Sequence, residues 1–428
     1  MSGLLFITFL ITLFSGMPIA FALGISAFVF FTQWGGVPMD VIAHRFFDSI
    51  NQFVLLSIPF FILAGEIMNK TGITKNLVEF AYICVGKLRG GLAHANILAS
   101  ILFAGLTGAG VSDTSALGSI LIPAMKEKGF EADYSAAVTA ASSVIGPIIP
   151  PSIIMVVFGS IMGISVGSLF AAGFVPGILI GIGLMIMAYI ISSKRGHPRR
   201  TEPVKLKEFL IAFKDAFLAL LMPIIIIGGI LGGVFTPTEA AAIAVAYGLI
   251  IGFFVYRTLK LSDLPECLLK SAITTSIILL IIGFANVFGW ALAIERIPQQ
   301  LARFFISMGL NKITFLLVVN GLLLFMGMIM ETGANAILLG PVLMPVAVQL
   351  GINPLHFAMI MLVNLNIGLA TPPLGVCLFV AAPIAEISLE KLSKAIFPFL
   401  AVEVIVLLFL TYIPELTLIV PRLIGFID

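Results

Sequence analysis

The sequence predicts an all-α polytopic membrane protein built from two related halves, and three observations support this. First, 60% of the 428 residues are hydrophobic and only 10% are charged, too few to cover a soluble domain. Second, the apolar residues form long runs, unlike the alternating stretches of about ten residues that build membrane barrels. Third, glycines and prolines recur at a fixed spacing in both halves.

The apolar runs account for most of the chain. At about 20 residues per crossing, its length allows on the order of ten to twelve spans and leaves no room for a soluble ATP-hydrolysing domain. No basic residue precedes Arg45, so the first run is predicted to be a retained span rather than a cleaved signal. The runs lie at 3–32, 52–68, 92–106, 134–162, 165–192, 216–234, 238–257, 268–295, 313–330, 355–382 and 395–421.

One segment is polar over a longer stretch, and it divides the chain almost in half. We assign 194–215 as a basic linker between a first repeat (1–193) and a second (216–428). The positive-inside rule places such a loop in the cytoplasm. The alternative is a phosphate or nucleotide patch. Its basic residues are Lys194, Arg195, Arg199, Arg200, Lys205, Lys207 and Lys214.

The two halves share a pattern of helix-breaking residues. A shift of 222 residues (327 minus 105) lays 105–151 on 327–373 without a gap. An internal repeat of interrupted apolar segments is typical of secondary transporters. The matched pairs are Gly105 with Gly327, Gly118 with Gly340, Pro123 with Pro345, Gly129 with Gly351, Gly146 with Gly368, and Pro150-Pro151 with Pro372-Pro373; Asp113 falls on Asn335. With another offset, Met17-Pro18 and Gly24 match Met222-Pro223 and Gly229.

Each repeat is predicted to contain a re-entrant hairpin and a broken helix. The hairpins lie near 105–128 and 327–350, and the broken helices near 134–160 and 355–380. Proline removes a backbone donor and glycine relaxes the backbone, so the breaks leave free carbonyl oxygens. Carbonyls, hydroxyls and a carboxylate suit a small cation, and half-helix N-termini favour an anionic substrate group.

Asp113 is the acid in the first hairpin, and a buried carboxylate needs a partner. No basic residue precedes Lys126 in that segment, so a cation is its natural partner. The alternative is a helix cap formed with Ser112 or Thr114. Glu331 has no acidic counterpart in the first repeat and lines either the substrate path or only a lumen.

Other functional classes find little support. The formal charge of +2 argues against a nucleic-acid partner, and three separated cysteines give neither a disulfide framework nor a zinc site. The segment 163–167 matches a nucleophile-elbow pattern but lies in an apolar helix, where its glycines are better explained by helix packing. No catalytic residue or cofactor is predicted. An ion channel or uniporter, or an intramembrane enzyme, remains the alternative.

Several strings resemble the large membrane subunit of the tripartite ATP-independent periplasmic (TRAP) transporters of bacteria and archaea, within the ion-transporter superfamily. The resemblance covers nearly the whole chain. The strings are FFILAGEIMNKTGIT (60–74), SDTSALGSILIPAM (112–125), IGPIIPPSI (145–153), GGVFTPTEAAAIA (232–244) and IGLATPPLGVCLFV (367–380).

The resemblance implies two inverted-topology repeats, with hairpins and broken helices that move as an elevator against a scaffold. It implies a multi-pass protein of the bacterial or archaeal cytoplasmic (inner) membrane. It also implies sodium as the coupling ion, a smaller four-helix membrane subunit, and a periplasmic binding protein that delivers an organic acid. C4-dicarboxylates, sialic acid and related carboxylates are the expected substrates.

Carried onto this chain, the resemblance also suggests site residues. One sodium ion would bind Thr107, Ser112 and Asp113 with backbone oxygens near Gly146 and Ile149. A second would bind Asn335, Gly368 and Thr371, with less charge compensation because Asn335 replaces an acid. The substrate would contact Ser152, Glu331 and Asn366.

Overall fold

The computed structural model describes residues 2–307 and 311–427, and helices are the regular secondary structure throughout these ranges. Eight of the described helical segments are long and apolar enough to cross a membrane, and further apolar helices of 10–17 residues lie between them. The all-α membrane class is therefore confirmed. The eight segments are Phe53–Lys70, Val166–Arg195, Leu206–Leu231, Pro237–Val255, Leu261–Ile294, Lys312–Ile329, Thr332–Gln349 and Leu389–Tyr412.

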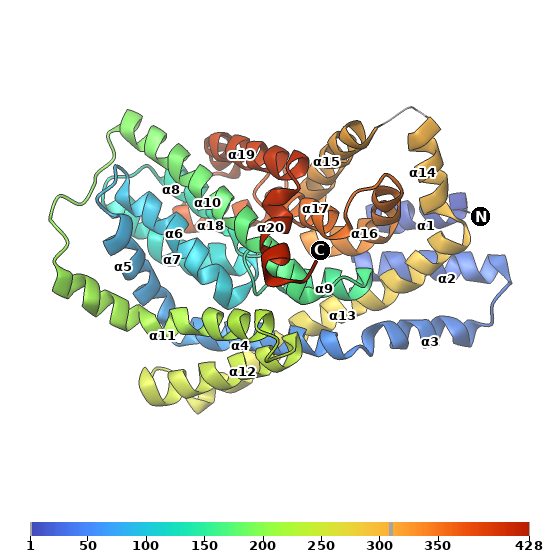
Figure 1. Cartoon of the computed structure of the whole chain (residues 1–428), viewed down its shortest axis with the longest axis horizontal. Coiled ribbons are helices and arrows are strands. Elements are labelled where there is room, and N and C mark those ends of the chain that lie inside the picture. The colour runs from blue at the N-terminus through green and yellow to red at the C-terminus, as the bar shows by residue number, and fades with distance from the viewer. Residues whose placement is uncertain (1, 308–310, 428) are drawn as a thin grey trace.

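An outer set of helices flanks the bundle that carries the Gly/Pro repeats. Helix α4 packs against α12 and α13, and α13 also packs against α2 and α3. Figure 1 shows α3, α4, α11 and α12 along one side of the molecule. The outer set comprises α1 (Ser2–Phe14), α2 (Ile19–Trp34), α3 (Met39–Ile50), α4 (Ser57–Lys70), α5 (Ile73–Val85), α11 (Leu206–Leu231), α12 (Pro237–Ile250), α13 (Leu264–Ile294) and α14 (Ile297–Ser307).

The inner bundle contains the same five-helix series twice. Helix α7 spans Gly110–Glu127, and adding 222 to both bounds gives those of α16, Thr332–Gln349. The other pairs are α6 (Gly91–Thr107) with α15 (Lys312–Ile329), α8 (Ala132–Ser142) with α17 (Pro354–Gly368), α9 (Ile153–Met162) with α18 (Val376–Ala385), and α10 (Val166–Arg195) with α19 (Leu389–Tyr412); α20 (Glu415–Ile424) follows.

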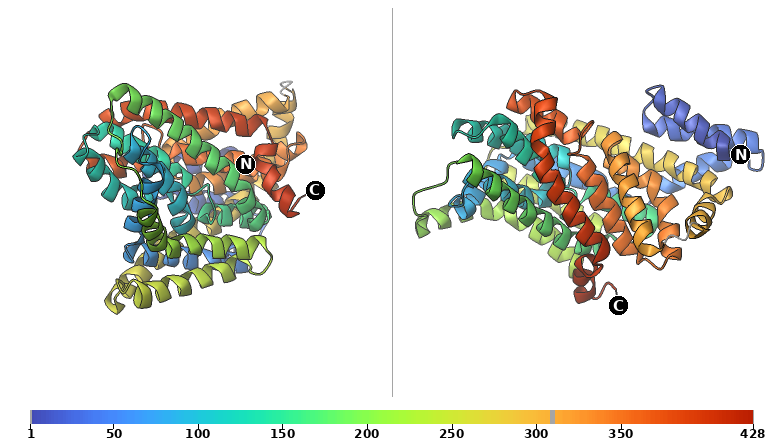
Figure 2. Two further views of the ribbon diagram at one scale, coloured as in Figure 1. Left: turned by 60° about the vertical axis from the view of Figure 1, so that its left-hand side comes forward. Right: turned by 90° about the horizontal axis from the view of Figure 1, so that it is seen from above.

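The two series interlock instead of standing side by side. Hairpin arm α7 of the first packs against half-helix α18 of the second, and arm α16 of the second packs against half-helix α9 of the first. Helix α8 also contacts α18 and α19. The two views in Figure 2 show the C-terminal helices laid across α6–α10. Both breaks and both hairpin tips are therefore brought to the middle of one bundle.

Polar clamps hold each hairpin to its broken helix inside an otherwise apolar bundle. In the first series, Asn96 on α6 donates to the Thr139 hydroxyl on α8 at 2.7 Å. In the second, Asn364 on α17 donates to the Asn320 side-chain oxygen on α15 at 2.8 Å, and Asn320 donates to Thr411 on α19 at 2.9 Å. Such bonds hold helices together where lipid supplies no hydrophobic driving force.

Several sequence-based expectations are wrong in detail. The run 3–32 is not one span: Gly16, with a positive φ of 84°, and Pro18 divide it into α1 and α2, which pack against each other. Its proposed counterpart Pro223 instead lies inside the continuous helix α11. Helices α3, α5 and α14 were not expected, because polar residues interrupt their apolar pattern. Glu239 forms a capping box with Thr236 at the start of α12.

The hairpins are longer than expected, and the linker is shorter. Arms α6 and α15 precede the predicted hairpin ranges almost entirely, because uniformly apolar arms look like ordinary spans. Both ends of the basic segment 194–215 are helical, so the connecting loop runs only over 196–205.

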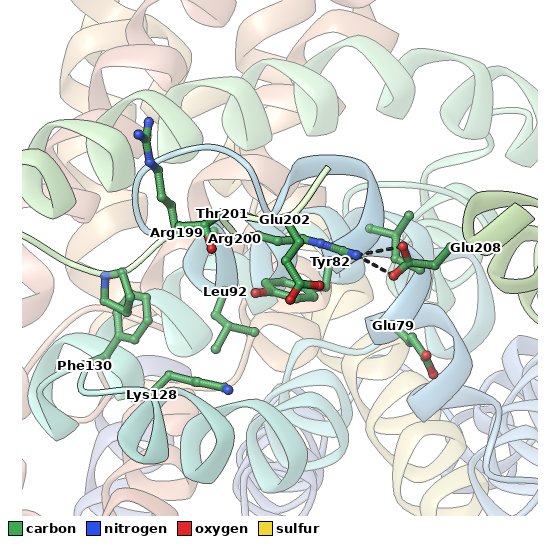
Figure 3. A pocket seen from close by; sticks show the side chains of 13 residues that line it. Glu79, Tyr82, Leu92, Lys128, Phe130, Arg199, Arg200, Thr201, Glu202 and Glu208 are labelled. Carbon is green, nitrogen blue, oxygen red and sulfur yellow. Dashed lines mark hydrogen bonds and ion pairs between the residues drawn. The ribbon is translucent and has the colours of Figure 1, made fainter. Parts of the chain in front are cut away.

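This loop is fastened to the turns of the bundle. His197 Nε2 lies 2.6 Å from Glu131 Oε2, and the Arg200 amide donates to the Gly86 carbonyl at 2.9 Å. Nη2 of Arg200 donates to both carboxylate oxygens of Glu208, at 2.5 and 2.7 Å (Figure 3).

A cavity of about 500 Å³ lies beneath the loop. It is larger than the cavity between the hairpin tips, described below, but shares no lining residue with it. Its charges balance, so we assign it to loop packing rather than to the transport path. The charged residues are Glu79, Glu202, Glu208, Lys128, Arg199 and Arg200.

We expect Glu131→Gln to loosen the loop. Burial alone raises the pKa of the Glu131 carboxyl, but the hydrogen bond to His197 and the charge of Arg195 hold that pKa below its usual value. The stabilising contact of Glu131 with His197 and Arg195 is therefore fully present above the ordinary glutamate pKa. It is lost as the pH falls through the lowered pKa of Glu131. At neutral pH, hydrogen–deuterium exchange at 196–205 should rise by up to about fivefold, the limit for an exposed ion pair. Glu202→Gln, in the same loop, should leave exchange unchanged. Equal exchange rates in the two variants would contradict a stabilising role for the contact of Glu131 with His197 and Arg195.

Candidate functional site

The tip of the first hairpin closes directly over the first helix break. Gly108 ends α6 with a positive φ of 61°, which glycine adopts without strain, and Ala109 is extended before α7 begins. A side chain at Gly108 would lie 2.6 Å from the Pro151 carbonyl oxygen. Since backbone meets backbone here, only a glycine fits.

Asp113 is held at this junction in the first turn of α7. Its side chain is fully buried, and Thr107 at the end of α6 donates a hydrogen bond to Oδ1. Oδ2 has no hydrogen-bond partner among the described residues and faces Gly146, where any added Cβ would collide with it. The acid therefore presents one free oxygen to the broken backbone.

The break supplies oxygens beside that carboxylate. Helix α8 ends at Ser142, and a short 3₁₀ turn follows over Ser143–Ile145. A continuing helix would bond the Gly146 carbonyl to the amide of residue 150, but residue 150 is proline and has no N–H. No hydrogen bond to the carbonyls of Gly146 and Ile149 is found in the described part of the chain. Thr107, Asp113 and these carbonyls all offer oxygen atoms, which suit a small hard cation. Thr107 and the Gly146 backbone are the ones that contact Asp113 directly.

The second hairpin has the same backbone but a different chemical character. Asn335 takes the place of Asp113 and is also fully buried. Its amide donates to the carbonyls of Met326 and Met330 at 3.0 and 2.9 Å, while its Oδ1 has no partner in the described residues. A Cβ on Gly368 would lie 2.5 Å from the backbone of Gly327. The hairpin arm and the helix break therefore contact each other directly at these two glycines.

The carbonyls of the second break are mostly occupied. The Gly368 carbonyl accepts from the Thr371 amide at 3.1 Å, and the Thr371 carbonyl accepts from Gly375 at 3.1 Å. The Thr371 hydroxyl donates to the Ile367 carbonyl at 2.7 Å. The structure therefore gathers Asn335, Gly368 and Thr371 near one another, but leaves them fewer free oxygens than the first set has.

A cavity of about 270 Å³ separates the two hairpin tips. The first turns of α7 and α16 both contribute to it, so two helix N-termini border the same space. None of the lining residues is basic, and Glu331 is the charged one. Its polar lining residues are Ser112, Thr274, Glu331, Thr332 and Asn366.

Two of the three predicted substrate residues line this cavity, and the third does not. Glu331 is exposed to it just before α16, and Asn366 lines it with neither side-chain polar atom bonded to a described residue. Ser152 is fully buried outside the lining; its hydroxyl caps α9 and donates to the Pro147 carbonyl at 2.7 Å. Ser112, predicted as a sodium ligand, lies on the cavity wall. Thr274, on α13, had no signal in the sequence, since only tertiary packing brings it here.

Paired hairpins, paired helix breaks and a central cavity define the class of protein as a secondary transporter. The chain also matches the family described as "Tripartite ATP-independent periplasmic transporter, DctM component" over residues 6–416. The chain belongs to that family. It is a multi-pass transporter permease of the inner membrane and not an enzyme.

Relatives and one solved structure agree with this assignment. The chain is 40% identical to the sialic acid TRAP transporter large permease SiaM of Vibrio cholerae, with 96% of each covered. It is 41% identical to the isethionate TRAP permease DctMQ of Oleidesulfovibrio alaskensis (96% of this chain, 65% of that protein). It is 40% identical to the C4-dicarboxylate large permease DctM of Pseudomonas aeruginosa, with 90% of each covered. The Alcanivorax borkumensis YdaH transporter shares the fold, with a TM-score of 0.62, 14% identity, and 90% and 87% coverage.

We expect Gly146→Ala to disable the first oxygen set. The added methyl group would displace the Asp113 carboxylate from the break. Uptake should fall by on the order of tenfold or more, as expected for the loss of a charged ligand. Gly321→Ala on α15 is the matched control, because nothing lies within 4 Å of that position. Unchanged uptake by correctly inserted Gly146→Ala protein would contradict the geometry.

Proposed function

We propose that the chain is the sodium-coupled permease subunit of a tripartite importer of organic acids. The observation that carries the proposal is the buried Asp113 carboxylate, with one oxygen unpartnered, beside the unbonded Gly146 carbonyl at the first break. Sodium bound there neutralises a charge that is costly inside a membrane protein. The second set, around Asn335, would take another sodium ion with less compensation of its charge.

The cavity between the hairpin tips supports an anionic substrate. Two helix N-termini and the Asn366 amide offer hydrogen-bond donors to its negative group. Glu331 on the same wall accepts hydrogen bonds, so it favours an acid that also carries a hydroxyl or N–H donor. Sialic acid, C4-dicarboxylates and related organic acids, which relatives transport by name, are the substrates to test.

The partners proposed are those of a tripartite system. The matched family is one component of a three-part transporter. We assign the remaining parts to a small four-helix membrane subunit and a periplasmic binding protein that hands over the acid. In this scheme the inner bundle moves as an elevator past the outer helices, carrying the cavity across the membrane.

The sodium assignment predicts that Asp113→Ala abolishes sodium-driven uptake while the protein still inserts. Labelled organic acids would be followed into proteoliposomes that contain both membrane subunits, with and without an inward sodium gradient and the binding protein. We expect at least a tenfold loss for Asp113→Ala, since a charged ligand is removed. Asp133→Ala, a half-buried acid on α8, should stay near wild type. Wild-type uptake that needs neither sodium nor binding protein would instead indicate a channel or uniporter.

The elevator scheme predicts that joining the two cavity walls stops transport. Val111 on α7 and Ile278 on α13 both line the cavity, one from each helix set. A double-cysteine variant, made with the exposed Cys84 replaced by serine, would be treated with a short cleavable crosslinker. Uptake should stop and return after cleavage, while both single-cysteine variants stay active. Full-rate transport by the crosslinked protein would exclude the scheme.

A further inference from the structure

Glu403 is a fully buried acid that the proposed transport site does not use. It lies in the middle of α19 with 0% of its surface exposed. Neither carboxylate oxygen has a hydrogen-bond partner, and no ion pair involves it, within residues 2–307 and 311–427. Asp113 and Glu403 are the two buried carboxylic acids of this described part.

No cation faces Glu403 from the helices packed on α19, which are α8, α10, α17 and α18. Tyr134 on α8 packs on Phe399, one turn away, and its hydroxyl lies 3.0 Å from Ser192 Oγ. His356 on α17 is bonded to the Thr411 carbonyl at 3.2 Å, two turns beyond Glu403. The remaining titratable groups of these helices, apart from Cys377, lie near their ends and are half-buried or exposed: Asp133, Tyr189, Lys194 and Arg195.

Helix α18 lies between the helices of the two acids. It carries the fully buried Cys377 and packs against both α7, which carries Asp113, and α19, which carries Glu403. If both acids were ionised, two negative charges would act on one apolar region of the bundle. Burying an ionised carboxylate without a partner is so costly that the group takes up a proton instead.

The surroundings of the two acids favour different ways of neutralising a buried carboxylate, a bound cation for Asp113 and a bound proton for Glu403. Asp113 has a hydroxyl donor, a helix N-terminus and a broken backbone beside it, whereas Glu403 sits within an unbroken helix. Paired acids in unlike environments commonly divide their roles in this way. We propose that Glu403 is a proton-binding site that stays occupied, so that the inner bundle contains one neutral acid in addition to the acid of the proposed cation site. The cation site at Asp113 rests on the proposed function, whereas the proton on Glu403 does not.

Infrared spectroscopy tests the proton directly. In purified, lipid-embedded protein at neutral pH and saturating sodium, the wild type should show a protonated-carboxyl C=O stretching band. Glu403→Gln should lack this band, and Glu390→Gln should keep it, because Glu390 is an exposed acid on the same helix. A band of equal size in wild type and Glu403→Gln would show that Glu403 is ionised and overturn the proposal.

Transport supplies a second test. Glu403→Gln and the apolar Glu403→Met both mimic a neutral group, so each should retain sodium-driven uptake within about twofold, in mildly acidic and mildly alkaline buffer alike. Loss of uptake by both variants, when folded, would mean that Glu403 must ionise during the cycle. If Asp113→Ala transports normally, the sodium assignment fails while the infrared result for Glu403 still stands.

Discussion

The unbonded carbonyl oxygens at the first helix break are the feature on which the site depends. A chain surrounded by lipid has to satisfy its backbone polar groups internally. Pro150 and Pro151 remove the two amides that would have bonded the Gly146 and Pro147 carbonyls. The Ser152 hydroxyl donates to the Pro147 carbonyl, and the Asp113 carboxylate lies against Gly146. In the proposed function, a cation beside Asp113 would bind the carbonyl oxygen that has no hydrogen-bond donor.

The two halves repeat a backbone but not its charge. The bounds of the second hairpin arm recur after 222 residues, as the helix pair 110–127 and 332–349 shows. In the second half, however, Asn335 donates to its own hairpin, and the break carbonyls bond to nearby amides. The second set is therefore nearly satisfied without an ion, whereas the first is not. In the proposed function, the two sets would therefore bind sodium with unequal affinities.

Sequence predicts the parts of this fold that depend on glycine and proline, because these residues act on the backbone locally. Both breaks and both tips were placed this way. The runs 92–106 and 313–330 were predicted as ordinary spans and not as hairpin arms, since α6 and α15 are mostly apolar, and α5 was missed because polar residues interrupt it. Thr274 reaches the cavity only through the packing of α13 against α16. Glu403 did leave a signal, an acid in the middle of an apolar stretch of the run 395–421, and such acids are rarely without a role.

Charge balance links these features to movement. In the proposed cycle, a neutral Glu403 adds no charge to the inner bundle, so Asp113 alone decides whether the first site carries a buried charge. With sodium bound, that site is neutral; an Asp113 that stayed ionised without sodium would be an unpaired carboxylate in a low-dielectric interior. Moving the bundle across the apolar layer is then cheaper with the ion than without it. Coupling thus follows from the cost of a bare carboxylate, and it requires that the second acid be neutral.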